Sequence, residues 1–253
     1  MKKKISIITV CFNSAATIRD TIESVLCQDY PNIEYIVIDG GSTDGTIDIV
    51  REYGDDIDVV VSEPDEGIYD AMNKGIAVAT GVVVGLLNSD DIYADSSVVK
   101  DLVEQMDAAG SDAVFADLVI VDAQNTDRVL RYYDSSSFYP DRLAGGWMPA
   151  HPTFMVKRDL YIKYGGYALD YHIAADYEMV ARLLYKAGAS YTHLPKVVIK
   201  MRAGGVSTRG LMSNWILNNE IVRACRANGI RTNLLKVLLK VPFKLLEYVR
   251  RPK

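Results

Sequence analysis

Short runs of β-branched and other apolar residues alternate with segments of helical periodicity in the first part of the chain. The runs ISIITV, EYIVID, VVVSE and VVVGLLN predict four buried strands, at residues 5–10, 34–39, 59–63 and 82–88. Between them, apolar residues three and four positions apart predict helices at residues 17–28, 46–53 and 68–79. This alternation predicts an α/β fold in which helices cover both faces of a mostly parallel central sheet.

The pattern is less regular after residue 91. Strand-like runs and helical periodicity still occur, with strands predicted at residues 113–122, 128–134 and 193–202 and helices at 96–109 and 175–187. The stretch SSSFYPDRLAGGWMPAHPT predicts a loop at residues 135–153. Because no repeat or low-complexity linker divides this body, we expect one domain with two halves and a helical extension, at residues 1–205 (halves 1–95 and 96–205) and 206–253.

The composition is that of an ordinary globular protein. With 253 residues, of which 49% are hydrophobic and 24% charged, the chain can bury a substantial core. No apolar run reaches the roughly 18 residues that a membrane-spanning helix needs, and MKKKISIITV lacks the long apolar segment and cleavage site of a secretion signal. The three cysteines are too widely spaced for a disulfide framework or a zinc cluster. We therefore expect a cytoplasmic protein.

Charge is divided unevenly along the chain. Residues 1–195 contain 15 Lys and Arg against 31 Asp and Glu, whereas residues 196–253 contain 13 against 2. A basic segment on an acidic body favours a polyanionic surface as the partner of that segment, either a membrane or a nucleic acid.

The last segment, RTNLLKVLLKVPFKLLEYVRRPK, has the pattern of an amphipathic helix. Lys236, Lys240 and Lys244 share a narrow strip of the helical wheel, and apolar residues fill most of the rest. Pro242 is expected to kink the helix into two short pieces. Two interpretations are open: docking on the body or a partner subunit, and binding to an anionic membrane surface, which we favour.

Polar side chains follow each of the four predicted strands. They are Thr9 and Asn13 after the first strand, Asp39 after the second, Asp65 after the third, and Asn88, Ser89, Asp90 and Asp91 after the fourth. Ligands of open α/β sheets bind beyond the carboxyl ends of the strands, so we expect these side chains on one rim. Adjacent carboxylates can both stay ionised when one holds a cation and the other accepts hydrogen bonds from a ligand. The rim therefore predicts a site for a polar ligand and a divalent cation.

The segments SIITVCFN, YIVIDGGSTDGT, SEPDEGIYDAMNKGI and LNSDDIY resemble, in order and spacing, the nucleotide-sugar-binding half of family 2 glycosyltransferases with the GT-A fold. The resemblance continues through HPTFMVKRDLYIKYGGY and IAADYEMVARLL and covers about residues 4–205. It implies a Rossmann-like sheet and an inverting enzyme that uses Mn²⁺ or Mg²⁺ to move a sugar from a nucleotide-sugar donor, expected to be a UDP-sugar, to an acceptor hydroxyl. It also implies a role in the biosynthesis of O-antigen, capsule or exopolysaccharide. The acceptor would be a saccharide on a polyprenyl diphosphate lipid, and the enzyme would act at the inner face of the cytoplasmic membrane.

The resemblance assigns nucleotide contacts to three residues of the rim. Asp39 would accept a hydrogen bond from the base, while Thr9 and Asn13 would contact the base and ribose. Local alternatives exist, because Asp commonly caps a turn such as GGST and Asn is a suitable N-cap for the following helix. We expect Thr43 and Asp44 to cap the turn and the next helix.

The third and fourth strands are followed by the residues expected near the diphosphate. Asp65, Asn73 and Lys74 lie in a segment that flanks the nucleotide and diphosphate in the family, although Lys74 is also placed for a surface ion pair with Asp70. In NSDD, the resemblance puts Ser89 and Asp90 at the nucleotide, Asp90 on the ribose, and Asp91 on the cation. Asn88 stands where many relatives have Asp, which leaves the number of protein ligands open. One carboxylate can suffice, because Mg²⁺ commonly takes one or two carboxylates plus phosphate oxygens.

Asp176, in the sequence AADYE, is the expected catalytic base. It matches the second acid of a family element whose first acid is replaced here by Ala175, and inversion needs a base opposite the leaving diphosphate. The alternative role for an Asp at a helix start is interaction with the helix dipole. Glu178 is the substitute candidate for the base.

Three more side chains of the second half have two possible roles each. His151 lines the acceptor or diphosphate pocket or stabilises its own loop. Arg202 meets the diphosphate or is solvated. Trp147 stacks on a sugar or packs within the protein.

Two other functions are compatible with such a sheet: a sugar-phosphate nucleotidyltransferase, and a non-enzymatic binder of nucleotides or nucleic acid. A nucleotidyltransferase commonly has a Gly-rich, basic loop after its first strand, whereas VCFNSAATIRD contains one Arg and no Gly. A nucleic-acid binder needs base-stacking aromatic residues on a basic groove, and this body is acidic. We favour the glycosyltransferase and expect no nucleic-acid partner; a homo-oligomer is compatible with the sequence.

Overall fold

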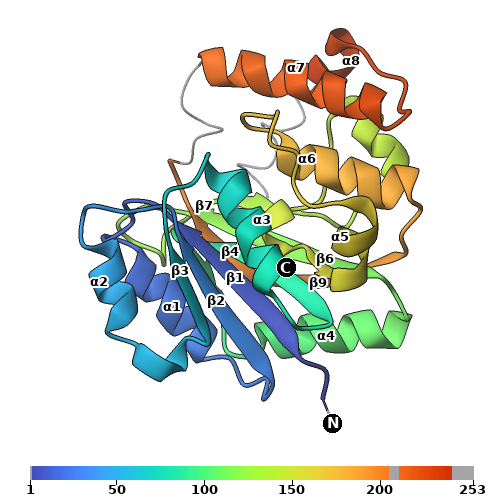
Figure 1. The fold of residues 1–253 in the computed structure, drawn as a ribbon. Coiled ribbons are helices and arrows are strands. Elements are labelled where there is room, and N and C mark those ends of the chain that lie inside the picture. The colour runs from blue at the N-terminus through green and yellow to red at the C-terminus, as the bar shows by residue number, and fades with distance from the viewer. Residues whose placement is uncertain (1, 205–210, 241–253) are drawn as a thin grey trace.

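The computed structural model describes residues 2–204 and 211–240. Within these residues, nine strands form one sheet in the order β3-β2-β1-β4-β8-β6-β9-β5, with β7 paired to β6 (Figure 1). The strands are β1 (Ile5–Cys11), β2 (Ile33–Asp39), β3 (Val59–Ser62), β4 (Val83–Asn88), β5 (Asp91–Tyr93), β6 (Ala113–Val121), β7 (Val129–Tyr133), β8 (Met155–Lys157) and β9 (Tyr191–Arg202).

Strands β1 to β4 are parallel, as their sequence patterns predict. The register pairs Cys11 of β1 with Asp39 of β2, and Asp39 with Ser62 of β3. On the other side of β1, Val10 pairs with Asn88 of β4. The polar residues that end these strands therefore meet at one edge of the sheet.

The second half of the sheet is mixed. Strand β8 pairs antiparallel with both β4 and β6, β9 is parallel to β6, and β5 is antiparallel to β9. The predicted α/β class is confirmed, but β5 and β8 are absent from the prediction. Each has only three residues, which is too short for an alternating pattern to be recognised.

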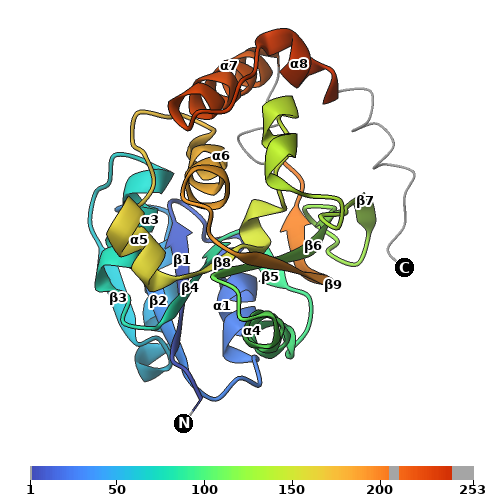
Figure 2. The ribbon, with the colours of Figure 1, turned by 90° about the vertical axis from the view of Figure 1, so that its right-hand side faces the viewer.

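Alternate residues of the central strands pack on opposite faces of the sheet. In β1, Ile8 and Val10 belong to a core shared with α3, α6 and α7, while Ile5 and Ile7 belong to a core shared with α1 and α4. Figure 2 shows α1 and α4 below the sheet and α6 and α7 above it. The α-helices are α1 (Ile18–Leu26), α2 (Thr46–Arg51), α3 (Ile68–Val78), α4 (Val98–Ala109), α5 (Arg158–Tyr164), α6 (Ala175–Val180), α7 (Leu211–Ala227) and α8 (Leu234–Leu238).

Four short helical segments complete the body, and the first is the 3₁₀-helix η1 (Gly54–Asp56) before β3. The loop predicted at residues 135–153 contains two 3₁₀-helices, η2 (Pro140–Gly145) and η3 (His151–Thr153). The helix predicted at residues 175–187 begins as α6 and continues as a π-helical segment, η4 (Ala181–Lys186).

Helices α7 and α8 are the described part of the predicted extension and lie across the top of the molecule in Figure 1. Helix α7 packs against α6, and α8 packs against η2. Val237 is fully buried, and Lys240 is buried with its Nζ 3.4 Å from the carbonyl oxygen of Gly146. The expectation that Lys240 faces a membrane is therefore wrong, because this end of the extension docks on the body.

Pro242 and Lys244 lie outside the described residues, and so does the predicted kink. Across residues 2–204 and 211–240, no helix combines the length and apolar character needed to cross a membrane.

Candidate active site

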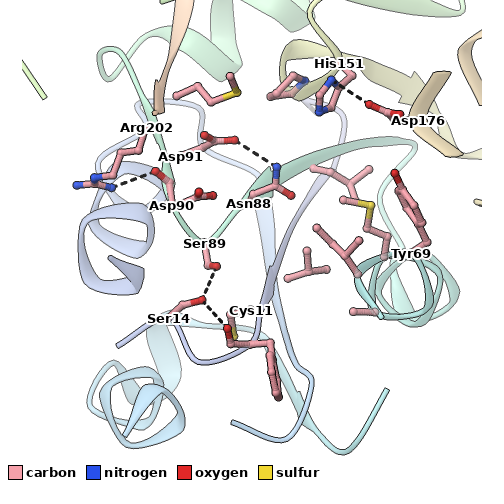
Figure 3. A pocket seen from close by; sticks show the side chains of 18 of the residues that line it. Cys11, Ser14, Tyr69, Asn88, Ser89, Asp90, Asp91, His151, Asp176 and Arg202 are labelled. Atoms are coloured by element: carbon pink, nitrogen blue, oxygen red, sulfur yellow. Dashed lines mark hydrogen bonds and ion pairs between the residues drawn. The ribbon is translucent and has the colours of Figure 1, made fainter. Parts of the chain in front are cut away.

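A cavity of about 940 Å³ lies beyond the carboxyl ends of β1 and β4 (Figure 3). Its walls come from both halves of the chain. Of the residues that the sequence offered as site candidates, those that line it are Asp65, Asn88, Ser89, Asp90, Asp91, His151, Asp176 and Arg202. The topology therefore brings the predicted cation ligand and the predicted base to one cavity.

Asn88 and Asp91 form the polar floor at the end of β4. Asp91 is 1% exposed, and its Oδ2 accepts a hydrogen bond of 3.3 Å from Asn88 Nδ2. The other oxygens of this pair, Asn88 Oδ1 and Asp91 Oδ1, are buried without a hydrogen-bond partner. Buried acceptors are normally satisfied, so each of these two unsatisfied oxygens marks a place where a ligand is expected.

The electrostatics of this floor disfavour two free carboxylates. Burial, and next the negative charge of Asp90, raise the pKa of Asp91 well above its usual range. Burial also raises the pKa of Asp90, and Arg202 opposes that rise. Arg202 donates to the carbonyl oxygen of Asp90 at 3.1 Å and pairs with the carboxylate of Asp20. Arg202 is thus built into the wall rather than solvated.

The residues present fit a divalent cation. Oxygen ligands suit Mg²⁺ and Mn²⁺, which take one or two carboxylates from the protein and the remaining ligands from water and phosphate. Asp91 Oδ1 and Asn88 Oδ1 are two such oxygens. Among the described residues, no group of three or more His, Cys, Asp or Glu side chains is arranged to hold a metal, so a bound cation here depends on ligand oxygens as well.

Asp39 lies behind the cavity and does not line it. Its carboxylate is fully buried and accepts hydrogen bonds from the amide of Ser42, at 3.3 and 3.2 Å, and from Ser62 Oγ at 2.7 Å. Cys11 donates its thiol to the same carboxylate at 3.7 Å, and burial raises the pKa of that thiol. These contacts are the ones expected if Asp39 caps the GGST turn. The hydrogen bond from a nucleotide base to Asp39 stays a prediction.

Thr9 and Asn13 also lie outside the cavity. Thr9 is fully buried, and its hydroxyl accepts a hydrogen bond of 3.1 Å from Tyr35. Asn13 has a φ of 49° and its side chain accepts from the amide of Thr43 at 2.9 Å. Thr9 therefore supports the sheet and Asn13 supports the turn.

Asn73 and Lys74 of α3 have structural partners as well. The Asn73 amide pairs with the backbone of Tyr167 in both directions, at 2.9 and 2.7 Å. Lys74 contacts Glu63 at 3.0 Å and Asp70 at 3.3 Å. The ion pair that the spacing of Asp70 and Lys74 allows is thus present.

Asp44 has the capping role that was expected of it. Its Oδ1 accepts from the amide and hydroxyl of Thr46 at the start of α2, and its Oδ2 accepts from the amide of Ala15 at 3.0 Å. Hydrogen bonds from Thr46, followed by that from Ala15, lower the pKa of Asp44.

Asp65 and Ser89 are held at the cavity wall by tight local contacts. Asp65 accepts from the amide of Gly67 at 2.9 Å and lies against Gly40, where an added Cβ would be 2.2 Å from Asp65 Oδ2. Only glycine allows this approach. Ser89 Oγ lies 2.8 Å from Ser14 Oγ, so the fourth strand end is joined to the loop after the first (Figure 3).

Asp176 contacts His151 across the second half of the cavity (Figure 3). The distance from His151 Nδ1 to Asp176 Oδ2 is 3.1 Å, and the side chains are 41% and 18% exposed. Asp176 Oδ1 accepts from the amide of Tyr177 at 2.7 Å. A carboxylate and an imidazole in contact at an accessible cavity wall are suited to proton transfer.

Glu178 and Trp147 are outside the cavity. Glu178 is buried in an ion pair with Arg182, 2.9 Å away, and accepts from Asn228. It is therefore a poor substitute for the base. Trp147 packs beneath the guanidinium of Arg142, 5.3 Å from the ring centroid, as its packing alternative predicts.

Several lining residues were not predicted. Tyr69 and Tyr167 stack with ring centroids 5.7 Å apart, and Phe12 and Ile68 stand at the cavity with exposed fractions of 62% and 48%. The exposure of large apolar residues is a signal of a ligand site, but it is visible only once the fold is known.

A family model described as Glycosyl transferase family 2 matches residues 6–165, more than half of the chain. The chain belongs to glycosyl transferase family 2. It is thus a glycosyltransferase, and the predicted family and enzyme class are confirmed.

Relatives of this glycosyltransferase are found in mycobacteria. An uncharacterized glycosyltransferase of Mycobacterium tuberculosis is 36% identical over 179 residues, which cover 70% of this chain and 68% of the relative. A PGL/p-HBAD biosynthesis glycosyltransferase of Mycobacterium bovis is 28% identical over 222 residues, which cover 86% of this chain and 82% of the relative.

Solved structures share the fold at low sequence identity. S. aureus TarS 1-349 in complex with UDP-GlcNAc has a TM-score of 0.69 and 19% identity, over 90% of this chain and 68% of that one. The mannosyltransferase PcManGT from Pyrobaculum calidifontis, in complex with GDP-Man and Mn²⁺, has a TM-score of 0.68 and 22% identity, over 98% and 74%. The predicted GT-A-like fold is confirmed.

Proposed function

We propose that this glycosyltransferase is inverting and metal-dependent, and that it moves a sugar from a UDP-sugar to an acceptor hydroxyl. One observation carries the proposal: Asn88 Oδ1 and Asp91 Oδ1 are buried without a partner in the same cavity that the Asp176–His151 pair lines. A cation site and a proton-accepting pair in one cavity suit a metal-assisted inverting transfer to a hydroxyl.

The chain's own residues divide into two groups in this proposal. Asp91 would hold Mn²⁺ or Mg²⁺, with Asn88 Oδ1 as a second oxygen. A bound cation supplies positive charge that offsets the diphosphate as it leaves. Asp65, Ser89 and Asp90 line the donor end of the cavity.

At the other end, the Asp176–His151 pair would take the proton of the acceptor hydroxyl as its oxygen attacks the anomeric carbon. The sugar–phosphate bond breaks on the opposite face, which inverts the configuration of that carbon. Removing the proton during attack typically accelerates such a step by about 10²–10⁴-fold.

One related structure supports a UDP-sugar as donor, and another supports Mn²⁺ as the metal. TarS was solved with UDP-GlcNAc, and the Pyrobaculum enzyme with GDP-Man and Mn²⁺. The Mycobacterium bovis relative is named for PGL/p-HBAD biosynthesis. We propose that the acceptor here is also part of a glycoconjugate, namely a saccharide on a polyprenyl diphosphate lipid.

A lipid-linked acceptor would place the enzyme at the inner face of the cytoplasmic membrane. Helix α8 and the residue after it expose Leu235, Leu238 and Leu239, and the sequence beyond residue 240 adds Lys244 and three further basic residues. Apolar and basic side chains together are typical of a segment that binds an anionic membrane surface.

A donor screen tests the proposal. The purified protein is incubated with UDP-sugars and GDP-sugars, Mn²⁺ or EDTA, and a synthetic lipid-diphosphate saccharide, and the released nucleoside diphosphate is measured. We expect one UDP-sugar to be used, only with metal, and NMR of the product to show an inverted anomeric centre. Retention of configuration, or equal turnover in EDTA, would contradict the proposal.

A further inference from the structure

The segment that carries Asp176 lies between the cavity and helix α7. Residues 170–178 include His172, Ile173 and Asp176, all of which line the cavity. Helix α7 follows the body of the predicted domain and packs against α6 on the face away from the donor end. It lies outside residues 6–165, which the family model matches.

Glu220 of α7 is the main polar link between the two. Its side chain is only 8% exposed, yet it accepts three backbone hydrogen bonds, from the amides of His172 at 2.8 Å, Ile173 at 2.9 Å and Ala174 at 2.9 Å. A carboxylate that accepts several charge-assisted bonds from consecutive amides holds that backbone strongly.

Two more residues, Arg223 of α7 and Asn228 just after its end, hold the ends of the same segment. Arg223 donates to the carbonyl oxygen of Asp170 at 2.6 Å and lies 3.7 Å from the ring centroid of Tyr171. Asn228 donates to Glu178 at 3.2 Å. Helix α7 therefore contacts the segment before Asp176, and Asn228 contacts it after Asp176.

On the cavity side, a hydrogen bond from Tyr69 holds this segment in addition to the contact between His151 and Asp176. Tyr69 of α3 donates its hydroxyl to the carbonyl oxygen of Ile173 at 2.6 Å. The residue just before α6, Ala174, has no side-chain acceptor to cap the helix, and Glu220 accepts its amide instead. The direction in which Asp176 leaves the start of α6 is thus set largely from α7.

We propose that Glu220 is a positioning residue for Asp176 and that α7 is a working part of the active site rather than an appendage. This inference rests on the proposed role of the Asp176–His151 pair. Glu220 acts through the backbone of residues 172–174 and does not touch the substrates. Its loss should misplace Asp176 relative to His151 without altering the donor end.

Glu220→Gln is the most direct test. Glutamine has nearly the same shape, but one acceptor oxygen becomes an NH₂ group, which cannot accept from the amides that face it. Arg226→Gln is the matched control, because Arg226 is an exposed charged residue on the same helix.

Histidine NMR reads the position of Asp176 without any substrate. The chain has three histidines. His151 contacts Asp176, the amide of His172 donates to Glu220, and His193 contacts Asp117 at 2.9 Å. Asp176→Asn defines the shift of the His151 ring nitrogens when the carboxylate is lost. We expect Glu220→Gln to shift His151 in the same direction and to leave His193 unchanged, and Arg226→Gln to shift neither.

Kinetics separate positioning from stability. With the donor found by the screen, we expect Glu220→Gln to lower kcat at least about tenfold and to leave UDP affinity within about twofold. In the double variant, Glu220→Gln should lower the kcat of Asp176→Asn by less than about twofold, because the effects of two residues that act through one group are not additive.

The possible results are distinct. An unmoved His151 signal in folded Glu220→Gln, or full additivity with Asp176→Asn, would overturn the inference. If Glu220→Gln does not fold, Arg223→Gln takes its place. This change alters the half-exposed contact at Asp170, and it is judged by the same His151 signal and the same test of additivity. If the parent enzyme turns over no nucleotide sugar, the proposed function fails, and the NMR comparison still decides whether α7 positions Asp176.

Discussion

One carboxylate oxygen of Asp176 accepts a hydrogen bond from the amide of Tyr177, and the other lies 3.1 Å from Nδ1 of His151. Asp176→Asn keeps the size of the side chain and cannot accept a proton. We expect the variant to fold and to bind UDP and Mn²⁺ like the parent, but to transfer sugar at least about a hundredfold more slowly. Asp159→Asn, an exposed position in α5, is the control. Near-normal turnover would leave Asp176 with only a capping role, for which Asn serves equally well.

Glu34 is a buried carboxylate far from the cavity, and it links stability to pH. Burial alone would raise its pKa, but hydrogen bonds from Lys4, Ser6 and Thr80 outweigh burial and lower the pKa to about 2, from an ordinary value of 4.5. A lowered pKa stabilises the fold above the unfolded-state value, and this contribution, on the order of 3 kcal/mol, is lost as the pH falls from about 4.5 toward 2.

Glu34→Gln should therefore reduce the free energy of unfolding at pH 7, and the difference from the parent should shrink below about pH 4.5. Urea unfolding at pH 7, 5, 4 and 3 measures this. A difference that is the same at every pH would show that the charge of Glu34 contributes nothing.

At the level of single residues, the sequence predicted which side chains line the cavity only in part, and it did not predict the tertiary contacts of the others. Asp91 and Asp176 line the cavity as expected, but Asn73 and Thr9 do not. Asn73 bonds to Tyr167, 94 positions away, and such a partner cannot be read from local spacing. A polar residue near a strand end can serve a ligand or the fold, and only the tertiary neighbours distinguish the two.

At the level of elements, strong periodicity was the reliable signal. Strands β1 to β4 and helices α1, α3 and α4 lie close to their predicted ranges because each has several residues that point to one core. The two short strands β5 and β8 were not predicted, since their pairing is set by distant strands. The amphipathic pattern after residue 230 did predict a helix, but not which face would be buried.

The docking of α8 determines where the chain can be shortened to test the proposed membrane contact. Val237 is fully buried, and an added Cβ on Gly146 would lie 3.0 Å from Val237 Cγ1, so removal of residues 231–240 would damage the body. Deleting only residues 241–253 should preserve folding and UDP binding and remove most sedimentation with anionic liposomes, by an amount that salt reduces. Replacing Leu235 and Leu239 with Ser tests the exposed apolar face separately. Undiminished sedimentation of both variants would exclude this surface as the membrane contact.

At the level of the whole molecule, two halves of different design meet at one cavity. The N-terminal half provides a parallel sheet whose strand ends supply acids and hydroxyls. Its parallel direction could be predicted because strands and helices alternate along this part of the sequence. The C-terminal half adds strands of both directions and the Asp176–His151 pair. His151 and Asp176 are far apart in sequence, and the contact between them required the structure.

The central claim is that Asp91 binds a divalent cation that the nucleotide donor needs. Calorimetric titration of UDP into the parent and Asp91→Asn, each in Mn²⁺ and in EDTA, measures it most directly, with Asp159→Asn as the control. We predict that Mn²⁺ tightens UDP binding to the parent and to the control at least about tenfold, which is about 1.4 kcal/mol, and that Asp91→Asn loses most of this gain. Equal UDP affinity in Mn²⁺ and EDTA for the parent, or an unchanged gain in Asp91→Asn, would contradict the account.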